Sequence, residues 1–310
     1  MKPHIYFNSN IDSPEEWKAA LSQHFPDMKY SVGEVCEEPD SVDVALVWKL
    51  PNRGLSDFKN LKAVLSLGAG INQLDPDKLP KNVPLARLVD DSLTQTMIEY
   101  AKAATFRYHR KFHLFERQSR EAQWAFLPPT LAQATSVGVL GLGELGGAIA
   151  KALAGEGFEV LGWSRTQKDV FGVATYSGKE VLSDMLANSD IIINVLPLTE
   201  DTRSILNRNF FAQCKRGACI INMGRGHHLV DADLLAAIDA GQIQAATLDV
   251  ATVEPLPPAH PFWGHPAILM TPHVAGISTP ETASIAVAQN IRRAIKGEPL
   301  AQQVDLSRGY

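Results

Sequence analysis

Short apolar runs alternate with longer amphipathic segments along most of the chain. Several of these runs are apolar at every position, which is typical of parallel strands covered on both faces. Runs of this kind predict strands at Ile5–Phe7, Val42–Trp48, Ala63–Leu67, Ser136–Leu140, Phe158–Trp163, Asp190–Leu196, Ala218–Met223, Ala245–Val250 and Ala267–Met270. The repeated strand–helix–strand order predicts an α/β fold with a mostly parallel sheet.

Helix signals stand out in three of the intervening segments. Ser13 and Pro14 open a capping box with Pro at the first helical position, so a helix is predicted from there to about Phe25. The span Ser92–Arg120 contains neither Gly nor Pro and predicts one long helix, and a last helix is predicted for 280–296. Because the long helix directly precedes a fresh strand–helix series, it is interpreted as a connector between two domains.

Length and composition limit the possible functions. A chain of 310 residues suggests about two domains at ~150 residues each. The 29 Lys and Arg residues against 34 Asp and Glu give a net charge of −5, which argues against a general nucleic-acid binder. The three cysteines cannot build a disulfide framework, and no apolar run approaches the ~18 residues of a membrane helix. These features together favour a cytoplasmic protein.

A glycine-rich turn follows the predicted strand Ser136–Leu140. It has the pattern G-x-G-x-x-G at Gly141, Gly143 and Gly146. The first glycine permits a tight turn, the second lets the backbone approach a pyrophosphate, and the third lets helix and strand pack closely. The helix N-terminus offers free N–H groups to the phosphates. Because strand, turn, helix and second strand follow in the required order, the motif predicts a dinucleotide site.

The end of the next strand indicates which dinucleotide is bound. It reads Ser164-Arg165 where NAD sites carry a carboxylate for the ribose 2′-hydroxyl. Ser164 can donate a hydrogen bond to a 2′-phosphate, and Arg165 can pair with it through a charge-assisted contact. Lys168 adds a second positive charge. A solvated basic loop is the alternative, but the position about 20 residues past the glycines favours NADPH over NADH.

Chemically active residues follow three later strands. They are Arg225, the pair Asp249 and Glu254, and His273. Open α/β sheets bind ligands at the carboxyl ends of their strands, so these side chains can converge. An arginine suits a carboxylate, a histidine exchanges protons near neutral pH, and a carboxylate can orient that imidazole. Taken singly, each also has a structural explanation, as a loop ion pair, a core histidine or a surface charge.

His109 and His113 have the i, i+4 spacing of a metal pair. Arg107, Arg110 and Lys111 surround them, which favours a basic helix face, and no metal is expected.

With these motifs the chain resembles the D-isomer-specific 2-hydroxyacid dehydrogenase family. The matching stretches are Leu67–Gly70, the glycine turn, Leu196–Thr199, Asn222–Gly226, Leu248–Val250, Glu254–Pro257 and Thr271–Gly276. Within the family, three stretches resemble the glyoxylate/hydroxypyruvate reductase A branch, namely Ala45–Trp48, Trp163–Thr166 and Val304–Tyr310. The chain departs from the family at 71–73, where Ile-Asn-Gln replaces the more usual acidic residue.

The resemblance implies two Rossmann-like or flavodoxin-like parallel-sheet domains joined by long helices, with the active site in the cleft between them. It assigns residues 1–98 and 284–310 to a substrate domain, to which the C-terminal helix returns. Residues 99–283 form the NADP-binding domain. The family also implies a homodimer. Trp124 is interpreted as a dimer contact or part of the partner's pocket, with ordinary core as the alternative.

The resemblance also implies roles for single residues. Arg225 binds and polarises the 2-oxo acid, and His273, paired with Glu254, is the acid/base. Backbone N–H groups of the Gly68-Ala69-Gly70 loop hold the substrate carboxylate, and Trp48 lines the substrate pocket. Asp249 binds the nicotinamide carboxamide. Further contacts to the cofactor are expected from Glu144, Leu145, Pro197, Thr199 and Met223.

These features predict an NADPH-dependent reductase of small 2-oxo acids, which converts glyoxylate to glycolate and hydroxypyruvate to D-glycerate. A dehydrogenase for another D-2-hydroxy acid is the alternative within the class. A dinucleotide-sensing binding protein is the alternative outside it. The set Arg225, Glu254 and His273 favours the enzyme, because a sensor needs no proton donor.

Overall fold

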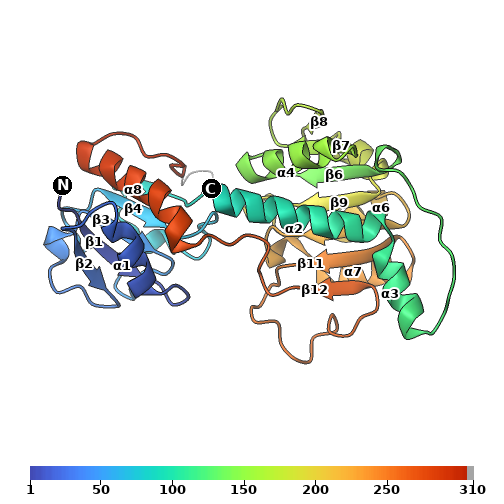
Figure 1. The fold of residues 1–310 in the computed structure, drawn as a ribbon, viewed down its shortest axis with the longest axis horizontal. Coiled ribbons are helices and arrows are strands. Elements are labelled where there is room, and N and C mark those ends of the chain that lie inside the picture. The colour runs from blue at the N-terminus through green and yellow to red at the C-terminus, as the bar shows by residue number, and fades with distance from the viewer. Residues whose placement is uncertain (306–310) are drawn as a thin grey trace. The chain divides into compact units, whose positions relative to one another are not determined.

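The computed structural model describes residues 1–305. The chain forms two compact units, one of Met1–Leu93 with the segment from Ile277 onward, the other of Thr94–Gly276 (Figure 1). The boundaries expected from the sequence, after residues 98 and 283, lie a few residues further along and stay predictions. Leu306–Tyr310, which complete the C-terminal motif, lie outside the described residues. Within the described part, no helix is long and apolar enough to cross a membrane.

The first unit is built on a parallel sheet with the strand order β2-β1-β3-β4-β5. This is the order of flavodoxin-like doubly wound sheets. The strands are β1 His4–Asn8, β2 Lys29–Val32, β3 Val44–Val47, β4 Ala63–Ser66 and β5 Leu85–Ala86. The helices of this unit include α1 Pro14–Ser22 and α8 Pro280–Lys296, which contact each other (Figure 1). As predicted, Ser13 caps α1 by accepting a hydrogen bond from the Glu16 N–H.

Both ends of the chain contribute to the core of this unit. Phe7 of β1 and Trp17 of α1 share one apolar cluster with Val287 and Ile291 of α8. All four side chains are buried. The C-terminal helix therefore returns to the first unit, as the resemblance implies.

The second unit holds a parallel sheet with the order β12-β11-β10-β9-β6-β7-β8. Its strands are β6 Ser136–Leu140, β7 Glu159–Ser164, β8 Val173–Ser177, β9 Ile191–Asn194, β10 Ala218–Asn222, β11 Ile243–Leu248 and β12 Ile268–Met270. Its helices are α2 Asp91–His109, α3 Phe112–Arg120, α4 Glu144–Gly155, α5 Leu182–Ala187, α6 Arg208–Gln213 and α7 Asp231–Asp239. The strand order reverses between β6 and β9, which is where doubly wound sheets bind dinucleotides. The predicted α/β class with two parallel sheets is confirmed.

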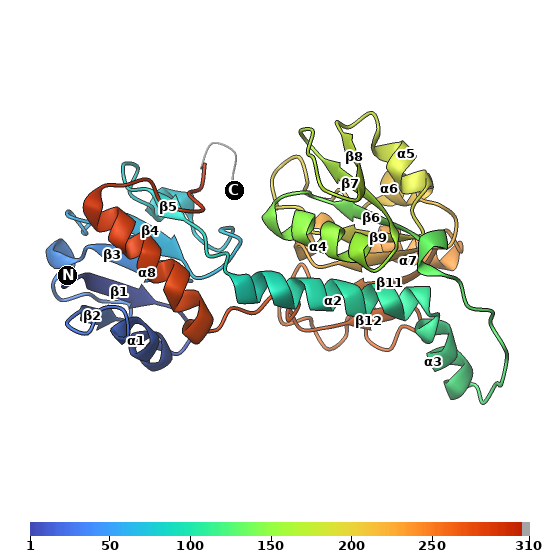
Figure 2. The ribbon, with the colours of Figure 1, turned by 45° about the horizontal axis from the view of Figure 1, so that its top comes forward.

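The sequence pattern missed β2, β5 and β8. All three are edge strands of their sheets (Figure 2). β2 and β8 are partly or fully exposed along their length, and β5 has only two residues. An exposed or very short strand at the edge of a sheet lacks the continuous apolar run by which the inner strands were recognised.

The predicted single helix over Ser92–Arg120 is wrong. The structure has two helices, α2 and α3, which are separated at Lys111, where the backbone is left-handed with φ 60°. The Lys111 ammonium donates to the Pro128 carbonyl, and Arg107 pairs with Glu116 across the turn. These contacts join segments distant in sequence, so a local pattern without Gly or Pro does not reveal the break.

The basic helix face predicted for His109 and His113 is also wrong, because both side chains are buried. His109 Nδ1 lies 3.0 Å from Thr135 Oγ1, and His113 Nε2 lies 2.9 Å from Gln244 Oε1. Each ring therefore has one nitrogen bonded to a different strand or loop of the second unit.

Candidate active site

The glycine turn has the geometry that a pyrophosphate site requires. Gly141 has φ +99°, a conformation that L side chains rarely adopt. A Cβ built on Gly146 would lie 1.8 Å from the Gly141 carbonyl oxygen, so only glycine lets α4 start this close to β6. A Cβ on Gly143, the N-cap of α4, would point into open space. Glu144 and Leu145 form the first turn of α4. The backbone at this helix N-terminus thus fits a dinucleotide phosphate.

The predicted 2′-phosphate loop follows the end of β7. Arg165 and Lys168 are exposed, whereas Ser164 is buried. The Ser164 hydroxyl donates to the Thr166 carbonyl oxygen at 2.7 Å, which closes the turn. Arg165 and Lys168 therefore lie at the surface of this loop, where their charged groups can contact a 2′-phosphate. To donate to that phosphate, the Ser164 hydroxyl has to rotate away from Thr166.

His273 and Glu254 form a direct pair. His273 Nδ1 lies 2.8 Å from Glu254 Oε2, and both side chains are 40% exposed. The second carboxylate oxygen accepts the Ala251 N–H at 2.9 Å. Burial alone raises the pKa of Glu254, but the two hydrogen bonds and the nearby charges of His273 and Arg225 outweigh it, so the pKa lies below its usual range. The glutamate is therefore an anion held against the imidazole of His273.

Asp249 organises the loop that carries His273. The backbone of His273 is left-handed, with φ 55°, and its N–H donates to the Asp249 carbonyl oxygen at 2.8 Å. The Asp249 carboxylate accepts from Thr271 Oγ1 at 2.6 Å, from the Val274 N–H at 2.9 Å and from the Ala275 N–H at 2.9 Å. These bonds hold a backbone conformation that costs of order 1–3 kcal/mol by itself.

The predicted contact of Asp249 with the nicotinamide carboxamide stays a prediction. Its Oδ1 accepts two of the three hydrogen bonds and its Oδ2 accepts one. A carboxylate oxygen accepts about two hydrogen bonds, so Oδ2 keeps one acceptor position for a further donor.

Arg225 follows β10, between two glycines that bring the backbone close to neighbouring segments. A Cβ on Gly226 would lie 1.9 Å from the Ala251 carbonyl carbon. Arg225 Nη1 donates to the Gly224 carbonyl oxygen at 2.8 Å, which leaves most of the guanidinium donors for a ligand. Burial lowers the pKa of Arg225 and the charge of Glu254 raises it. Glu254 thus interacts electrostatically with both Arg225 and His273.

Three further predicted cofactor positions lie after β9 and β10 of the second unit. Pro197 and Thr199 follow β9 in a turn closed by Thr202, whose hydroxyl donates to the Pro197 carbonyl oxygen at 2.7 Å. The Thr199 N–H donates to the same hydroxyl at 2.8 Å. Met223 is buried directly after β10.

The loop predicted to hold the substrate carboxylate lies in the first unit. A Cβ on Gly68 would lie 2.6 Å from the Trp48 ring, so the indole packs directly on this loop. The Gly68 N–H donates to Ser66 Oγ, and its carbonyl oxygen accepts the Leu88 N–H. Within residues 1–305, the N–H groups of the next two residues, at 69 and 70, have no protein acceptor. Two adjacent donors beside an indole suit a small carboxylate.

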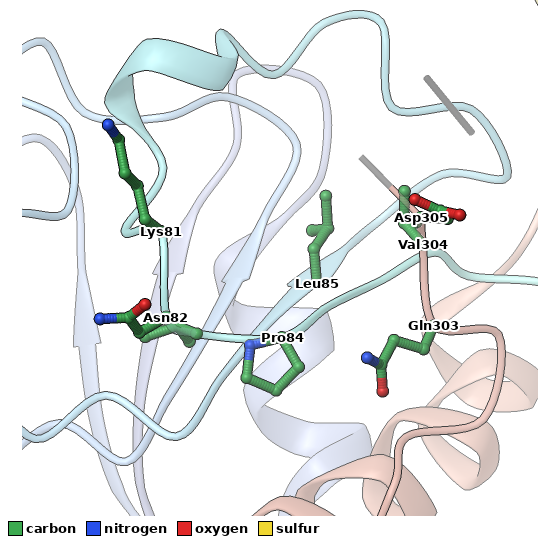
Figure 3. A pocket seen from close by; sticks show the side chains of 8 residues that line it. Lys81, Asn82, Pro84, Leu85, Gln303, Val304 and Asp305 are labelled. Atoms are coloured by element: carbon green, nitrogen blue, oxygen red, sulfur yellow. The ribbon is translucent and has the colours of Figure 1, made fainter. Parts of the chain in front are cut away.

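A surface hollow of the first unit does not contain these residues. It has a volume of about 650 Å³ and lies between β5 and the chain after α8 (Figure 3). Its lining includes Lys81, Pro84, Gln303 and Asp305, and none of the predicted site residues. In each unit, the candidate site residues therefore follow strand ends and do not line this hollow.

Sequence reasoning missed several polar residues beneath the site. Tyr100 of α2 bonds Thr271 at 2.7 Å, and Thr271 in turn donates to Asp249. Asn194 and His228 are fully buried beside the Arg225 turn. No short motif marks these residues, because each acts on a segment distant in sequence. The sequence did offer one signal for Asn194 and Asn222, because each is a polar residue at the end of an otherwise apolar strand.

Comparisons with known proteins give consistent findings. A family model described as D-isomer specific 2-hydroxyacid dehydrogenase, NAD binding domain, matches residues 103–275. The chain is 40% identical over 313 residues to glyoxylate/hydroxypyruvate reductase A of Serratia proteamaculans, covering 99% of this chain and 98% of the relative. It is 42% identical over 315 residues to the protein of the same name from Yersinia enterocolitica, covering 99% of each.

Solved structures agree over the whole chain. A D-isomer specific 2-hydroxyacid dehydrogenase from Xanthobacter autotrophicus Py2, in complex with NADPH and MES, has a TM-score of 0.95 at 42% identity and full coverage of both chains. An NADPH-dependent glyoxylate/hydroxypyruvate reductase from Sinorhizobium meliloti, in complex with NADP and sulfate, has a TM-score of 0.89 at 35% identity, again with full coverage of both.

Proposed function

This chain belongs to the D-isomer-specific 2-hydroxyacid dehydrogenase family, and from that premise we propose that it reduces glyoxylate to glycolate and hydroxypyruvate to D-glycerate with NADPH. The observation that carries the proposal is the hydrogen-bonded pair of His273 and Glu254, which shares its charge environment with Arg225. Relatives of 40–42% identity over nearly the whole chain bear the name of this activity. The chain is an NADP-dependent oxidoreductase.

The residues of the chain have distinct tasks in this reaction. When bound, NADPH supplies a hydride to C2 of the 2-oxo acid. Arg225 binds the substrate and stabilises the charge that develops on the carbonyl oxygen. His273 donates a proton to that oxygen. Because its Nδ1–H donates to Glu254, Nε2 is the atom left to transfer the proton. Glu254 fixes the ring through this hydrogen bond.

Trp48 supports the choice of small substrates over larger 2-oxo acids. Its ring packs on Gly68, beside the two N–H groups that we expect to bind the substrate carboxylate. An indole at this place limits the volume beyond C2. Glyoxylate has only a hydrogen there and hydroxypyruvate a hydroxymethyl group, so both are compatible with a confined pocket.

The test is a spectrophotometric assay of NADPH oxidation with glyoxylate, hydroxypyruvate, pyruvate and a branched 2-oxo acid. We expect the first two to have the highest kcat/KM. His273→Ala should lower the rate about 10²–10⁴-fold, the usual contribution of a positioned acid/base group. His265→Ala is the matched control, because His265 caps the Ala267 N–H outside the proposed site. Equal activity of the His273→Ala variant and the control contradicts the proposal, as does NADPH binding without turnover of any 2-oxo acid.

A homodimer is the second part of the proposal. The segment after α3 carries Trp124, which is fully exposed, and Phe126, which is 84% exposed. α3 and this segment extend from the sheet of the second unit in Figures 1 and 2. Burying a large apolar side chain stabilises by about 1.5–3 kcal/mol, so two exposed aromatics favour association with a second copy. Sedimentation velocity should give a dimer for the wild type and a shift toward monomer for Trp124→Ser with Phe126→Ser. A wild-type monomer contradicts this part.

A cytoplasmic location completes the proposal. Cys36, Cys214 and Cys219 are all unpaired, which suits a reducing compartment. Cell fractionation checks it, and recovery in an oxidising compartment contradicts it.

A further inference from the structure

His228 is a buried histidine that the proposed reaction does not use. It ends the short 3-10 helix Gly226–His228, directly after Arg225, and has no exposed surface. Its Nδ1 lies 3.1 Å from the backbone nitrogen of Arg225 and 2.9 Å from Asn194 Nδ2. Its Nε2 lies 3.2 Å from the Pro197 carbonyl oxygen. One ring thus contacts both the Arg225 turn and the Pro197 loop.

The donors around the ring determine its protonation. A backbone N–H can only donate, so Nδ1 accepts from Arg225 and carries no hydrogen. A carbonyl oxygen can only accept, so Nε2 carries the hydrogen and donates to Pro197. The geometry requires the neutral Nε2–H tautomer. Burial, reinforced by the charge of Arg225, lowers the pKa of His228 to about 4, so the ring keeps its Nδ1 acceptor at neutral pH.

The Arg225 peptide is held from its other side as well. Asn222 Nδ2 donates to the Arg225 carbonyl oxygen at 3.2 Å, while the Arg225 N–H donates to His228. Asn194 Nδ2 lies 2.9 Å from both Asn222 Oδ1 and His228 Nδ1, which its two hydrogens can serve together. The ends of β9 and β10 and the His228 ring therefore form one network around a single residue, Arg225.

Two glycines bring the backbone of this turn close to its neighbours. A Cβ on Gly224 would lie 3.0 Å from both Asn194 Nδ2 and His228 Nδ1. A Cβ on Gly226 would overlap the Ala251 carbonyl group. Because the backbone is enclosed on these sides, the direction of the Arg225 side chain depends on the His228 ring, which accepts the Arg225 N–H.

We propose that His228 is a positioning residue that fixes Arg225 for the 2-oxo acid and ties it to the Pro197 loop at the cofactor. This role rests on the proposed function, in which Arg225 binds the substrate. His228 does not touch the substrate itself. It acts through the Arg225 backbone on one side and the Pro197 carbonyl on the other.

Three substitutions separate the two contacts. His228→Asn keeps an acceptor near the place of Nδ1 and loses the donor to Pro197. His228→Gln keeps a donor near the place of Nε2 and loses the acceptor for Arg225. His228→Leu loses both. We expect the KM for glyoxylate to rise about tenfold or more in the Gln and Leu variants, because both leave the buried Arg225 N–H without an acceptor. In the Asn variant the KM should stay within about threefold of the wild-type value.

His113→Leu is the matched control. His113 is also a buried histidine of the second unit, but it bonds Gln244. A merely structural role of His228 predicts that both Leu variants lose stability and change KM alike. Rescue of KM by Asn, with no KM change in the control, supports the proposal. An unchanged KM in the Gln and Leu variants, or equal KM changes in both Leu variants, overturns it.

Two measurements keep this proposal distinct from the proposed function. Arg225→Ala measures the substrate role of Arg225 itself, and if its KM and kcat are normal, the assigned site fails and the His228 role with it. If Arg225→Ala is impaired while the His228 variants bind glyoxylate normally, only the role of His228 is overturned. Should a His228 variant not fold, ¹⁵N chemical shifts of the wild-type imidazole decide: we expect protonated Nε2 and bare Nδ1 at pH 7, and the opposite tautomer or a charged ring overturns the proposal.

Discussion

Replacing Asp249 by Asn removes a buried negative charge that organises the His273 loop. Asp249 Oδ1 accepts from Thr271 and from the Val274 N–H, and Oδ2 accepts the Ala275 N–H. Asparagine fills the same space, but one of its two terminal atoms is an NH₂ donor. Whichever way the amide is turned, this donor faces a backbone N–H, that of Ala275 or that of Val274.

The cost follows from these contacts. An orphaned buried N–H destabilises by about 1–3 kcal/mol, and a hydrogen bond that loses its charged acceptor weakens by roughly 1 kcal/mol. One orphaned group and two weakened bonds together cost about 3–5 kcal/mol. That exceeds the cost of order 1–3 kcal/mol of the left-handed His273 backbone, so the loop should leave this conformation. Turnover should fall about 10- to 100-fold, because His273 is no longer aligned.

Hydrogen exchange of the Val274 and Ala275 amides reports the loop directly, and urea unfolding reports the whole unit. Thr271→Val is the matched control, because it removes one of the three bonds to Asp249, together with the Tyr100 bond to Thr271, and brings no donor to the carboxylate. It should cost about 1–3 kcal/mol and leave the two amides protected. NADPH affinity, measured by fluorescence, separates a loop effect from a lost carboxamide contact. Wild-type amide protection together with wild-type kcat in Asp249→Asn would refute the reasoning.

Three further predictions concern the charged residues. Arg165→Ala should weaken NADPH binding about 10- to 100-fold, which is the contribution of a charge-assisted hydrogen bond, and leave NADH binding nearly unchanged. Fluorescence titration with both cofactors checks this, and equal losses of affinity exclude the 2′-phosphate contact. Arg225→Lys keeps the charge but not the planar fork, so kcat/KM for glyoxylate should fall at least about tenfold in initial-rate assays, and near-normal turnover removes Arg225 from the substrate. Glu254→Gln replaces the carboxylate that accepts from His273 Nδ1, so kcat for glyoxylate should fall in initial-rate assays, and an unchanged kcat contradicts the pairing. Because the pKa of Glu254 lies below its usual range, the wild-type pair should persist as pH falls and should weaken only when the pH passes through that lowered pKa.

The sequence predicts the inner strands well, because a strand covered on both faces must be apolar throughout. β2 and β8 lie at sheet edges and carry no such run. The break at Lys111 has no Gly or Pro to mark it, and its stabilising contacts reach Pro128 and join Arg107 to Glu116. Edges and breaks of this kind depend on neighbours that a local pattern does not contain.

The candidate site also contains residues that a local sequence pattern reveals and residues that it does not. Arg225, Glu254 and His273 are recognisable because reactive groups follow strand ends in a characteristic order. Glu254 and His273 do meet, at 2.8 Å. His228 and Asp249 are different, since their importance lies in which backbone groups they hold. Those contacts depend on the packed loops, so the sequence suggested a cofactor contact for Asp249 and assigned no role to His228.

The shared core of β1, α1 and α8 has a consequence for biosynthesis. The first unit gathers its apolar cluster from the two ends of the chain, whereas the second unit is continuous in sequence. As the chain leaves the ribosome, Phe7 and Trp17 emerge first but meet Val287 and Ile291 only after the whole second unit has been made. The N-terminal segment therefore waits with part of its apolar surface uncovered, while the later-made unit can already fold. The first unit can close only after α8 has been made, and until then the apolar face of its N-terminal part stays uncovered and needs shielding.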